Sequence, residues 1–311
     1  MSQDPSRPGL VRSARELFLR FAASGMVSPA RFLPLAPTPE LLRPGSGRLS
    51  LEIVSHCWRY PHLLAYQLSS LVCYPPTELS VHMTAFHAGE DLETVALLEF
   101  FGAMEVPGVT WNWQRLDRQH LFRRAIGRNL AALSSTADWV WFTDCDVIFH
   151  RGCLDGLARQ VQGRRDVLVF PRVEHCTPLL PTTHPMLTAT ADTPRVVEID
   201  PSLFLARERS RATGPMQIVH GDAARTVGYC ACLPTYQLPA ERWQKCHEDR
   251  AFRWLLRTQG APLEVPGVYR IRHASKGRYS SRVLSRGLRG SIRRVRSWWQ
   301  ERRMGAAAGK P

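Results

Sequence analysis

Trp139-Val140-Trp141-Phe142-Thr143-Asp144-Cys145-Asp146 joins a short run of bulky apolar residues directly to two carboxylates. The apolar run predicts a buried strand, and the two aspartates stand where that strand ends. Ligands of parallel α/β sheets bind at the carboxyl ends of the strands, and Mg²⁺ and Mn²⁺ prefer oxygen ligands. The triplet Asp144-Cys145-Asp146 is therefore a candidate metal site, although two aspartates at this spacing fit a surface turn equally well.

Strand and helix patterns alternate along the chain from Leu49 to this triplet. The predicted strands cover 49–55, 78–86, 109–114 and 139–143, and the predicted helices cover 61–73, 92–101 and 121–133. Such alternation predicts right-handed crossovers and a doubly wound, mainly parallel α/β sheet with flanking helices. Beyond the triplet the pattern is less regular, and it predicts strands over 166–173 and 195–206 and a helix over 247–259.

The chain of 311 residues fits a single catalytic-sized domain with extensions at both ends. Residues 1–48 contain seven prolines and end in a Pro-Gly-Ser-Gly run, so we expect an extension outside the core, with a short helix over 13–21. The domain is predicted over 49–279 and a tail over 280–311. No apolar run is long enough to span a bilayer and no secretory signal is evident, so cytoplasmic residence is expected.

The net charge of +14 is concentrated at the C-terminal end of the chain. Residues 270–311 hold 13 of the 41 Lys and Arg residues but one of the 27 acidic residues, so the rest is nearly neutral and no nucleic-acid partner is expected. Apolar residues between Leu284 and Trp299 recur at helical spacing among arginines, which predicts a basic amphipathic helix over 284–303. Such a helix suits peripheral contact with an anionic membrane surface. Packing on the protein's own domain and polyanion binding are the alternatives.

The eight cysteines include no CxxC pair and read as free thiols of a cytosolic chain. Cys230 and Cys232, with Cys246 and His247 further on, outline a possible zinc site. Lone CxC spacing is weak evidence for zinc, so free thiols are the favoured interpretation.

A second motif precedes the triplet and gives it a family context. A predicted helix carries Arg123-Arg124-Ala125-Ile126-Gly127-Arg128-Asn129, and a turn at Thr136-Ala137-Asp138-Trp139 leads into the strand. This order resembles family 2-type glycosyltransferases of the GT-A fold, a DxD-containing class. The resemblance is most specific over 123–149 and extends loosely from Leu49, through Glu52 to Pro61, as far as Ala274.

The resemblance implies a GT-A-like catalytic domain that uses a nucleotide sugar. Such an enzyme would move a sugar from a nucleoside-diphosphate sugar, a UDP-sugar before others, to a saccharide or lipid-linked hydroxyl acceptor. Inversion and dependence on Mn²⁺ or Mg²⁺ are implied with it. A tail that contacts the inner face of the membrane would bring the enzyme to lipid-linked acceptors.

The resemblance also assigns roles to individual residues. Asp146 would be the main metal ligand, with Asp144 closer to the ribose or to a metal-bound water. Arg128 would face the nucleotide or hold the loop beneath it, and a surface ion pair is the alternative. Trp58 would stack on the base, with core packing as the alternative.

Further roles are implied for residues late in the chain. Glu248 and Asp249 would supply the general base, Asp249 ahead of Glu248, although acids also favour the first turn of a helix. His273 would be a further metal ligand, while Arg272 and Lys276 would clamp the diphosphate. The segment His220-Gly221-Asp222 stands where the family often has a Gly-rich acceptor loop.

One departure from the family leaves the nucleotide open. Thr84-Ala85-Phe86 stands where an acidic pair usually grips the uracil or ribose, and Glu90 or Asp91 would have to replace it. Two other functions compete with glycosyl transfer. A nucleotidyltransferase acting on sugar phosphates would normally have a Gly-rich phosphate loop after the first strand, where this chain has Ser55-His56-Cys57-Trp58. The other is a non-enzymatic protein that binds polyanions through its basic tail.

Overall fold

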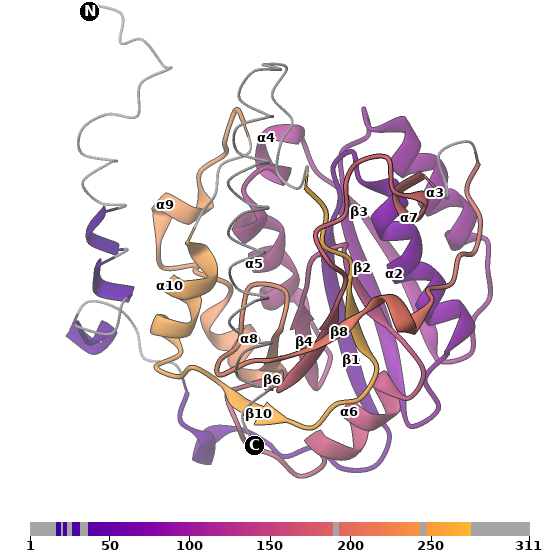
Figure 1. Ribbon diagram of the computed structural model, residues 1–311. Coiled ribbons are helices and arrows are strands. Elements are labelled where there is room, and N and C mark those ends of the chain that lie inside the picture. The colour runs from indigo at the N-terminus through magenta and orange to yellow at the C-terminus, as the bar shows by residue number, and fades with distance from the viewer. Residues whose placement is uncertain are drawn as a thin grey trace, which may run out of the picture.

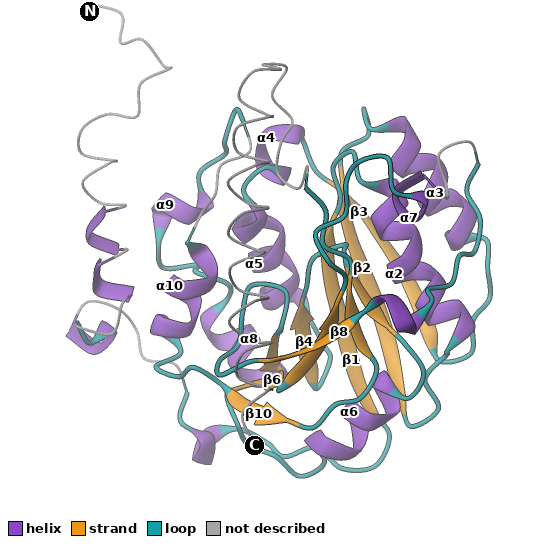
Figure 2. Ribbon diagram, viewed as in Figure 1, coloured by secondary structure: helices purple, strands orange, loops and turns teal. Residues whose placement is uncertain are grey.

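Two β-sheets organise the described part of the chain (Figures 1 and 2). The computed structural model describes residues 17–19, 21–23, 27–31, 37–188, 193–242 and 247–274. The larger sheet has seven strands in the order β10-β6-β9-β4-β1-β2-β3, and the smaller has four in the order β5-β11-β7-β8.

The larger sheet is mainly parallel. Its strands are β1 (Leu49–His56), β2 (Leu79–His87), β3 (Val109–Arg115), β4 (Trp139–Phe142), β6 (Leu168–Pro171), β9 (Gln217–His220) and β10 (Ala261–Leu263). β1 pairs in parallel with β2 and β4, β2 with β3, and β6 with β10. Only β9 runs against its neighbours β4 and β6. The predicted doubly wound, mainly parallel α/β sheet is confirmed.

Helices cover both faces of this sheet. They are α2 (Pro61–Cys73), α3 (Leu92–Gly102), α4 (Arg118–Leu121), α5 (Arg124–Ser134), α6 (Cys153–Val161), α7 (Pro185–Thr188), α8 (Gly221–Val227), α9 (Pro234–Gln237) and α10 (Glu248–Leu255), with 3₁₀ turns η2 (Pro29–Arg31), η3 (Pro39–Leu41) and η4 (Pro201–Leu203). In Figure 1, α2 and α3 lie to the right of the sheet, and α5, α8 and α10 lie to its left.

Alternation along the strands divides the core between these two faces. Trp139 and Trp141 of β4 join the cluster with α2, α3 and α6, whereas Val140 and Phe142 join the cluster with α5, α8 and α10. Successive side chains of a strand point to opposite faces. A strand buried on both faces therefore needs the uninterrupted apolar run that Trp139–Phe142 provides.

The smaller sheet was only partly predicted. It contains β5 (Val147–Phe149), β7 (Val173–Cys176), β8 (Leu205–Glu208) and β11 (Val268–Arg270). The predicted strand over 166–173 is divided between β6 and β7, which belong to different sheets. The predicted strand over 195–206 is wrong for most of its length, because residues 195–200 are irregular and a 3₁₀ turn precedes β8.

The N-terminal segment also departs from the prediction. Leu19, Ala22 and Leu42 are buried in the cluster around α5 and α10, and the indole N–H of Trp254 donates to the carbonyl of Val27 at 2.6 Å. The expectation that residues 1–48 lie outside the core is therefore wrong for these side chains, whereas Leu17, Phe18, Phe21 and Leu41 are exposed as expected. Prolines break regular structure but leave the intervening apolar side chains able to pack.

Two predictions fall on residues that the structure does not describe, namely the tail over 280–311 and residues 13–16 of the N-terminal helix. Within the described ranges, no helix has the length and apolar character needed to cross a membrane.

Candidate functional site

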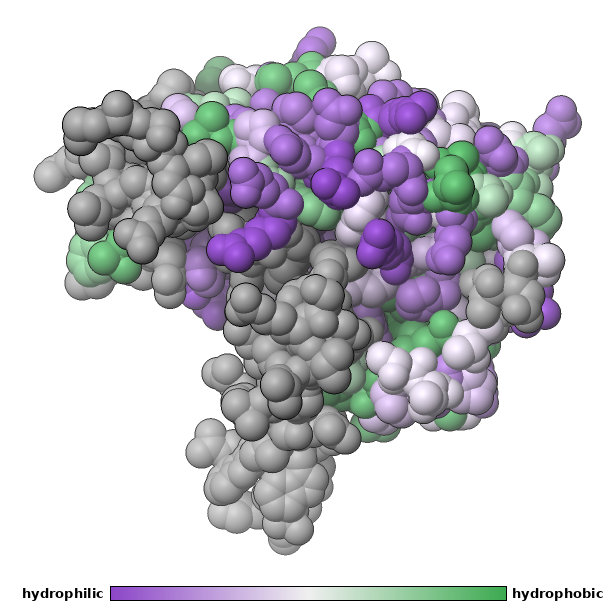
Figure 3. All heavy atoms as spheres, turned by 90° about the horizontal axis from the view of Figure 1, so that it is seen from above, coloured by the Kyte–Doolittle hydropathy of each residue, from purple (hydrophilic) through white to green (hydrophobic). Residues whose placement is uncertain are grey.

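The acidic triplet lies at the carboxyl edge of the parallel sheet. β1 and β4 pair in register, Val54 with Phe142, so the chain leaves both strands at the same edge. The amide of Thr143 continues the pairing by donating to the carbonyl of Val54 at 3.0 Å. This edge lies at the top of Figure 1, near α4, and hydrophilic residues run across the middle of the surface seen from above in Figure 3. The sequence-based prediction of where the triplet stands agrees with this placement.

The backbone of the triplet is held from the helix layer below it. The side-chain amide of Gln67 on α2 donates to the carbonyls of Asp144 (3.0 Å) and Val147 (2.9 Å). Asp144 is 8% and Asp146 1% exposed. A glutamine that satisfies two carbonyls of one turn restricts the conformations of that turn, which preorganises the two carboxylates.

Arg128 acts as a buried support for this turn. Its guanidinium donates to the Thr143 carbonyl (3.0 Å) and the Tyr229 hydroxyl (2.8 Å), and it lies 3.4 Å from Asp144 Oδ1. The side chain is fully buried, so it has no surface to offer a nucleotide and is not a surface ion pair. Of the roles considered for Arg128, holding the loop from beneath is the one that the geometry supports.

Arg124 brings the two acidic motifs together. Its Nη1 lies 2.5 Å from Asp144 Oδ1, and its Nε lies 3.4 Å from Glu248 Oε1 at the start of α10. Burial opposes the charge on this guanidinium, but the carboxylates of Asp144 and Glu248 outweigh burial and raise its pKa above the usual value. Arg124 is therefore a permanent cation at the centre of the site.

The two acids of α10 differ in accessibility. Glu248 is 1% exposed and faces Arg124, whereas the side chain of Asp249 is 33% exposed and lies 3.6 Å from Arg253. The backbone of Asp249 is also tied to the site, because Gln217 bonds both its carbonyl (3.0 Å) and the Tyr229 hydroxyl (2.9 Å). Only Asp249 of this pair presents a carboxylate to solvent.

The second carboxylate of the triplet faces the smaller sheet. Asp146 Oδ2 lies 3.4 Å from Arg270 Nε on β11, and its carbonyl accepts from the amide of Ile271 at 3.0 Å. Arg270 also lies 4.0 Å from the buried Glu174 of β7. Burial opposes the charge of Arg270, but Asp146 and Asp144 raise its pKa. The end of β11 is thus fastened to the triplet.

The triplet fits a divalent cation as a two-carboxylate site. Mg²⁺ commonly binds through one or two carboxylates and completes its shell with substrate phosphates and water. Among the described residues no three His, Cys, Asp or Glu side chains are grouped so as to hold a metal. Since Arg124, Arg128 and Arg270 already neutralise the aspartates, a cation would need the negative charge of a diphosphate beside it.

The late residues proposed as ligands are placed differently from the prediction. His273 is buried, packs edge-on against Tyr60 (4.9 Å between ring centroids) and is not grouped with the aspartates as a third ligand. The guanidinium of Arg270 takes the place next to Asp146 instead. Arg272 is half-buried and lies 3.5 Å from the Thr177 carbonyl. Lys276 lies outside the described residues.

Trp58 and the acids that follow β2 have structural roles in this protein. Trp58 is buried against Phe122 in the core cluster. Of the two roles considered for this side chain, the structure therefore supports core packing and not stacking on a nucleotide base. Asp91 accepts from the amide of Arg59 (2.6 Å), which has a φ of 57°, and from the Thr94 hydroxyl (2.8 Å). Glu90 is exposed and pairs with Arg118 at 3.0 Å. Asp91 therefore stabilises a left-handed turn, and its carboxylate is already engaged there.

Thr84 explains part of the departure from the family pattern. Its hydroxyl donates to the buried carboxylate of Glu52 at 2.7 Å, so this position satisfies a core acid on β1. A second carboxylate at position 84 would place two buried negative charges side by side, which is unfavourable.

The segment His220-Gly221-Asp222 lies at the opposite edge of the sheet and is wrong as an acceptor loop. β9 is antiparallel to β4, and its last residue, His220, pairs with Trp139, the first residue of β4. His220 accepts from the amide of Asp222 at 3.2 Å and caps α8. Burial alone would raise the pKa of Asp222, but hydrogen bonds from Arg225 and Arg43 lower it to about 2. These residues are structural.

The described cysteines are free thiols, and most of them are buried. Cys230 is fully buried, lies 3.5 Å from the carbonyl of Glu248 and has a pKa raised by burial and by the charge of Glu248. Cys232 is half-buried, and Cys246 falls outside the described ranges. The described partners of the proposed zinc site do not form a metal-binding group.

His56 is a functional candidate that the sequence reasoning missed. It ends β1 beside the triplet and stacks on Phe86 with 4.9 Å between ring centroids, and neither ring nitrogen has a hydrogen-bond partner among the described residues. Burial, then the charges of Arg128 and Arg124, lower the pKa of His56 well below its usual value, so the ring is neutral at pH 7.

The sequence analysis also did not name Arg124 and Arg270 as site residues. Arg124 stands one helical turn before Arg128, which is the sequence signal that could have found it, whereas no local signal marks Arg270.

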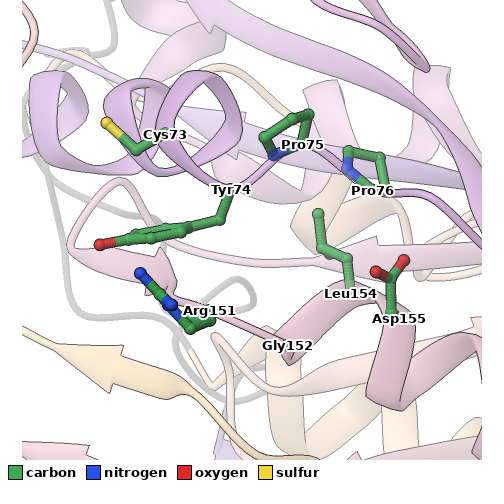
Figure 4. Close-up of a pocket in the computed structure, with 8 residues that line it drawn as sticks. All are labelled: Cys73, Tyr74, Pro75, Pro76, Arg151, Gly152, Leu154 and Asp155. Atoms are coloured by element: carbon green, nitrogen blue, oxygen red, sulfur yellow. The ribbon is translucent and has the colours of Figure 1, made fainter.

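A separate hollow of about 280 Å³ lies at the edge of the sheet opposite to the acidic triplet, and Figure 4 shows the residues that line it. Its walls include Tyr74, after α2, and Arg151 and Asp155, around the start of α6. Asp155 accepts from the amides of Thr77 (2.8 Å) and Glu78 (3.0 Å), immediately before β2. None of the predicted site residues lines this hollow.

Comparison with known proteins finds similarity only among solved structures. No protein-family model matches the chain, and no curated protein matches it. The chain is similar to the mannosyltransferase PcManGT from Pyrobaculum calidifontis in complex with GDP-Man and Mn²⁺, at 14% identity and a TM-score of 0.42, over 86% of this chain and 67% of that one. It is also similar to S. aureus TarS 1-349 in complex with UDP-GlcNAc, at 13% identity and a TM-score of 0.45, over 76% of this chain and 62% of that one.

Proposed function

We propose that this chain is a glycosyltransferase that moves a sugar from a nucleoside-diphosphate sugar to an acceptor hydroxyl, with inversion, using Mn²⁺ or Mg²⁺ at Asp144-Cys145-Asp146. The observation that carries the proposal is Arg124, which contacts Asp144 at 2.5 Å and Glu248 at 3.4 Å. The two acidic motifs lie far apart in the sequence, and contact with the same guanidinium supports a role for both in one site.

The donor would lie over the triplet. Asp144 and Asp146 would hold the cation, which when bound neutralises charge on the diphosphate leaving group. Arg270, 3.4 Å from Asp146, adds a fixed positive charge at the same place. Charges that are already oriented by the protein stabilise the departing diphosphate without reorganisation.

The acceptor would be activated from α10. Asp249 would accept the proton of the acceptor hydroxyl as its oxygen bonds to the anomeric carbon and the bond from that carbon to the diphosphate breaks. The partly exposed carboxylate of Asp249 suits this task, whereas Glu248 is buried against Arg124. Glu248 would therefore act as a positioning residue that orients Arg124 and the start of α10.

The wider setting of the reaction follows from the same proposal. The catalytic domain would span 49–279, and the acceptor would be a saccharide or a lipid-linked saccharide. The basic segment 284–303 would bring the protein to the cytoplasmic face of an anionic membrane.

A panel of nucleotide sugars tests the proposal directly. Release of nucleoside diphosphate should require Mn²⁺ or Mg²⁺, stop with EDTA and return when the metal is restored. Asp146→Asn should lower this release about 100-fold or more, because it removes a charged group from the reacting centre. The control is Asp166→Asn, which removes a half-exposed carboxylate paired with Arg164. Turnover that survives both EDTA and Asp146→Asn in folded protein would show that the proposal is wrong.

A further inference from the structure

The turn after β1 holds an arginine in a backbone conformation that suits glycine. Arg59 has a φ of 57°, in the left-handed region where a Cβ crowds the backbone. The turn is held through its backbone, because the amide of Arg59 donates to the Asp91 carboxylate at 2.6 Å. Glycine at this position would make the same bond without strain. An arginine kept in a disfavoured conformation that glycine would adopt freely points to a use for its side chain.

The side chain of Arg59 is exposed and already oriented. Its guanidinium lies over the ring of Trp58, 5.1 Å from the ring centroid. Trp58 is itself fixed by burial and by edge-on packing against Phe122, with 5.5 Å between ring centroids. Among the described residues, the guanidinium of Arg59 forms no ion pair with a carboxylate. A contact with an aromatic ring orients a cation without neutralising it, so the charge of Arg59 remains available to an anionic ligand.

Contacts on both sides of the turn place it between the two elements that flank the acidic triplet. On one side Trp58 packs against Phe122, which lies two residues before α5. On the other side Tyr60 packs edge-on against His273, three residues beyond the end of β11, with 4.9 Å between ring centroids. Because β1 and β4 are parallel neighbours, the turn after β1 and the triplet after β4 leave the sheet at the same edge. Since α5 and β11 carry the arginines that contact the triplet, Arg59 stands beside the proposed donor site.

The cations already described around the triplet are paired with carboxylates. Arg124 lies 2.5 Å from Asp144. Arg270 lies 3.4 Å from Asp146. Arg59 is a further cation at this edge, and its guanidinium has no such partner in the described part of the chain. An unpaired guanidinium suits phosphate oxygens, which its fork of N–H donors binds through paired hydrogen bonds. The diphosphate of a nucleotide sugar is the phosphate group that the proposed reaction brings to this edge.

We propose that Arg59 binds the diphosphate of the donor and stabilises it as the leaving group. This inference rests on the proposed function, and it gives to the turn after β1 the phosphate contact that the resemblance assigned to Arg272 and Lys276. Because the guanidinium is oriented over Trp58 before the donor binds, little side-chain freedom is lost on binding. Positive charge fixed next to the departing diphosphate stabilises the transition state without reorganisation.

Calorimetry with UDP and GDP in the presence of Mg²⁺ tests this role, using whichever nucleotide binds. Arg59→Gly should weaken binding about tenfold or more, as expected for loss of charge-assisted hydrogen bonds. Arg59→Lys should fall between the two, since lysine keeps the charge and loses the fork. The urea midpoint of Arg59→Gly should stay close to that of the unchanged protein, because relief of the left-handed strain offsets the greater freedom of glycine in the unfolded chain.

The matched control is Arg257→Gly. Arg257 is exposed and has a φ of 55°, so it shares the backbone conformation of Arg59. It follows the C-terminal end of α10, where a left-handed residue commonly ends a helix, whereas Glu248 and Asp249 stand at the other end of α10. Nucleotide affinity should not change in this variant. An equal loss in Arg257→Gly would show a general effect of removing an arginine and would overturn the proposal.

The corresponding nucleoside separates the diphosphate from the base. Uridine or guanosine should bind Arg59→Gly as it binds the unchanged protein, because it carries no phosphate. A loss for the nucleoside as large as for the diphosphate would place Arg59 at the base or ribose and overturn the proposal. Unchanged diphosphate affinity in Arg59→Gly would overturn it as well, and a lower urea midpoint beside that unchanged affinity would confine Arg59 to the turn.

The two proposals fail in different ways. If neither UDP nor GDP binds with Mg²⁺, the proposed donor site is wrong and the role of Arg59 falls with it. If nucleotide binds equally well to Arg59→Gly and to the unchanged protein, the proposed function stands and the role of Arg59 is wrong.

Discussion

Arg124 is the residue through which the two acidic motifs meet. Its guanidinium contacts both Asp144 and Glu248, while Arg128 supports Asp144 from the buried side. Asp144 has both arginines, but Arg124 is the arginine described next to the buried Glu248, and an uncompensated buried charge is strongly unfavourable. The buried carboxylates of Asp144 and Glu248 are thus stabilised by the arginines of α5.

Replacing Arg124 tests this dependence. Arg124→Gln should lower the free energy of unfolding by about 2–4 kcal/mol, somewhat less than full loss of a buried pair because Arg128 remains on Asp144. Urea unfolding at pH 7 measures the change. Arg118→Gln, which breaks an exposed pair with Glu90, should change stability by less than about 1 kcal/mol.

A double variant separates charge pairing from general disruption. If Arg124 mainly compensates Glu248, then adding Glu248→Gln to Arg124→Gln should recover part of the lost stability. Losses that simply add would contradict the ion pair as the source of the effect.

At the scale of elements, the approach of α5 to β1 depends on Gly127. A Cβ at this position would lie 2.3 Å from His56 Nε2 and 3.0 Å from the Phe86 ring. His56 and Phe86 stack on each other and both are buried, so moving either ring would disturb the packing around it. The absence of a side chain at Gly127 allows the helix that carries Arg124 and Arg128 to sit against the strand ends.

Gly127→Ala should therefore destabilise the fold although alanine favours helices. We expect a loss of about 1–3 kcal/mol from overpacking, measured by urea unfolding. Gly214→Ala is the control, because its added Cβ would meet its nearest neighbour, Asp249 Cβ, at an ordinary 3.7 Å. Equal stability of Gly127→Ala and the unchanged protein would mean that α5 can shift at no cost.

Asp222, in the first turn of α8, is expected to make stability depend on pH. The pKa of Asp222 is lowered to about 2 in the folded protein from an ordinary value of 3.8, so this group stabilises the fold above about pH 4 and loses that effect as the pH falls toward 2. Because its partner Arg43 is largely exposed, about 1 kcal/mol is expected. Asp222→Asn should lower stability by that amount at pH 7 and by little near pH 2.

Urea unfolding across this pH range checks the sign. Glu105→Gln, at an exposed position, should run parallel to the unchanged protein throughout. A loss in Asp222→Asn that is the same at pH 2 and pH 7 would contradict the electrostatic origin.

At the scale of the whole molecule, the basic tail is predicted to be separable from catalysis. Removing residues 280–311 should leave sugar transfer to a soluble acceptor intact, because the site lies in β1, β4, α5 and α10. Sedimentation with anionic vesicles should fall sharply, since each basic residue near such a surface adds about 1 kcal/mol. Neutral vesicles are the control. Salt-steep nucleic-acid binding that disappears with the tail would favour the polyanion alternative.

Much of the parallel half of the molecule was predictable from local pattern. The four strands and the helices between them lie close to their predicted positions, because apolar period and length identify such elements. The helix over 121–133 divides into α4 and α5, and Leu130 and Leu133 are about half exposed while Arg128 is buried. Prediction of the buried helix face from apolar periodicity assumes that charged residues face solvent. Arg128, which is buried and paired with Asp144, does not obey this assumption.

The sequence alone determined the mainly parallel α/β sheet and the position of Asp144 and Asp146 at a strand end, since both depend on short-range periodicity. Only the tertiary structure decided which residues share the site. Because β9 is antiparallel to β4, His220 lies at the edge of the sheet opposite to the acidic triplet. At the end of β11, Arg270 rather than His273 lies next to Asp146. Strand direction and register come from pairing between distant segments, which leaves no trace in the local pattern of either segment.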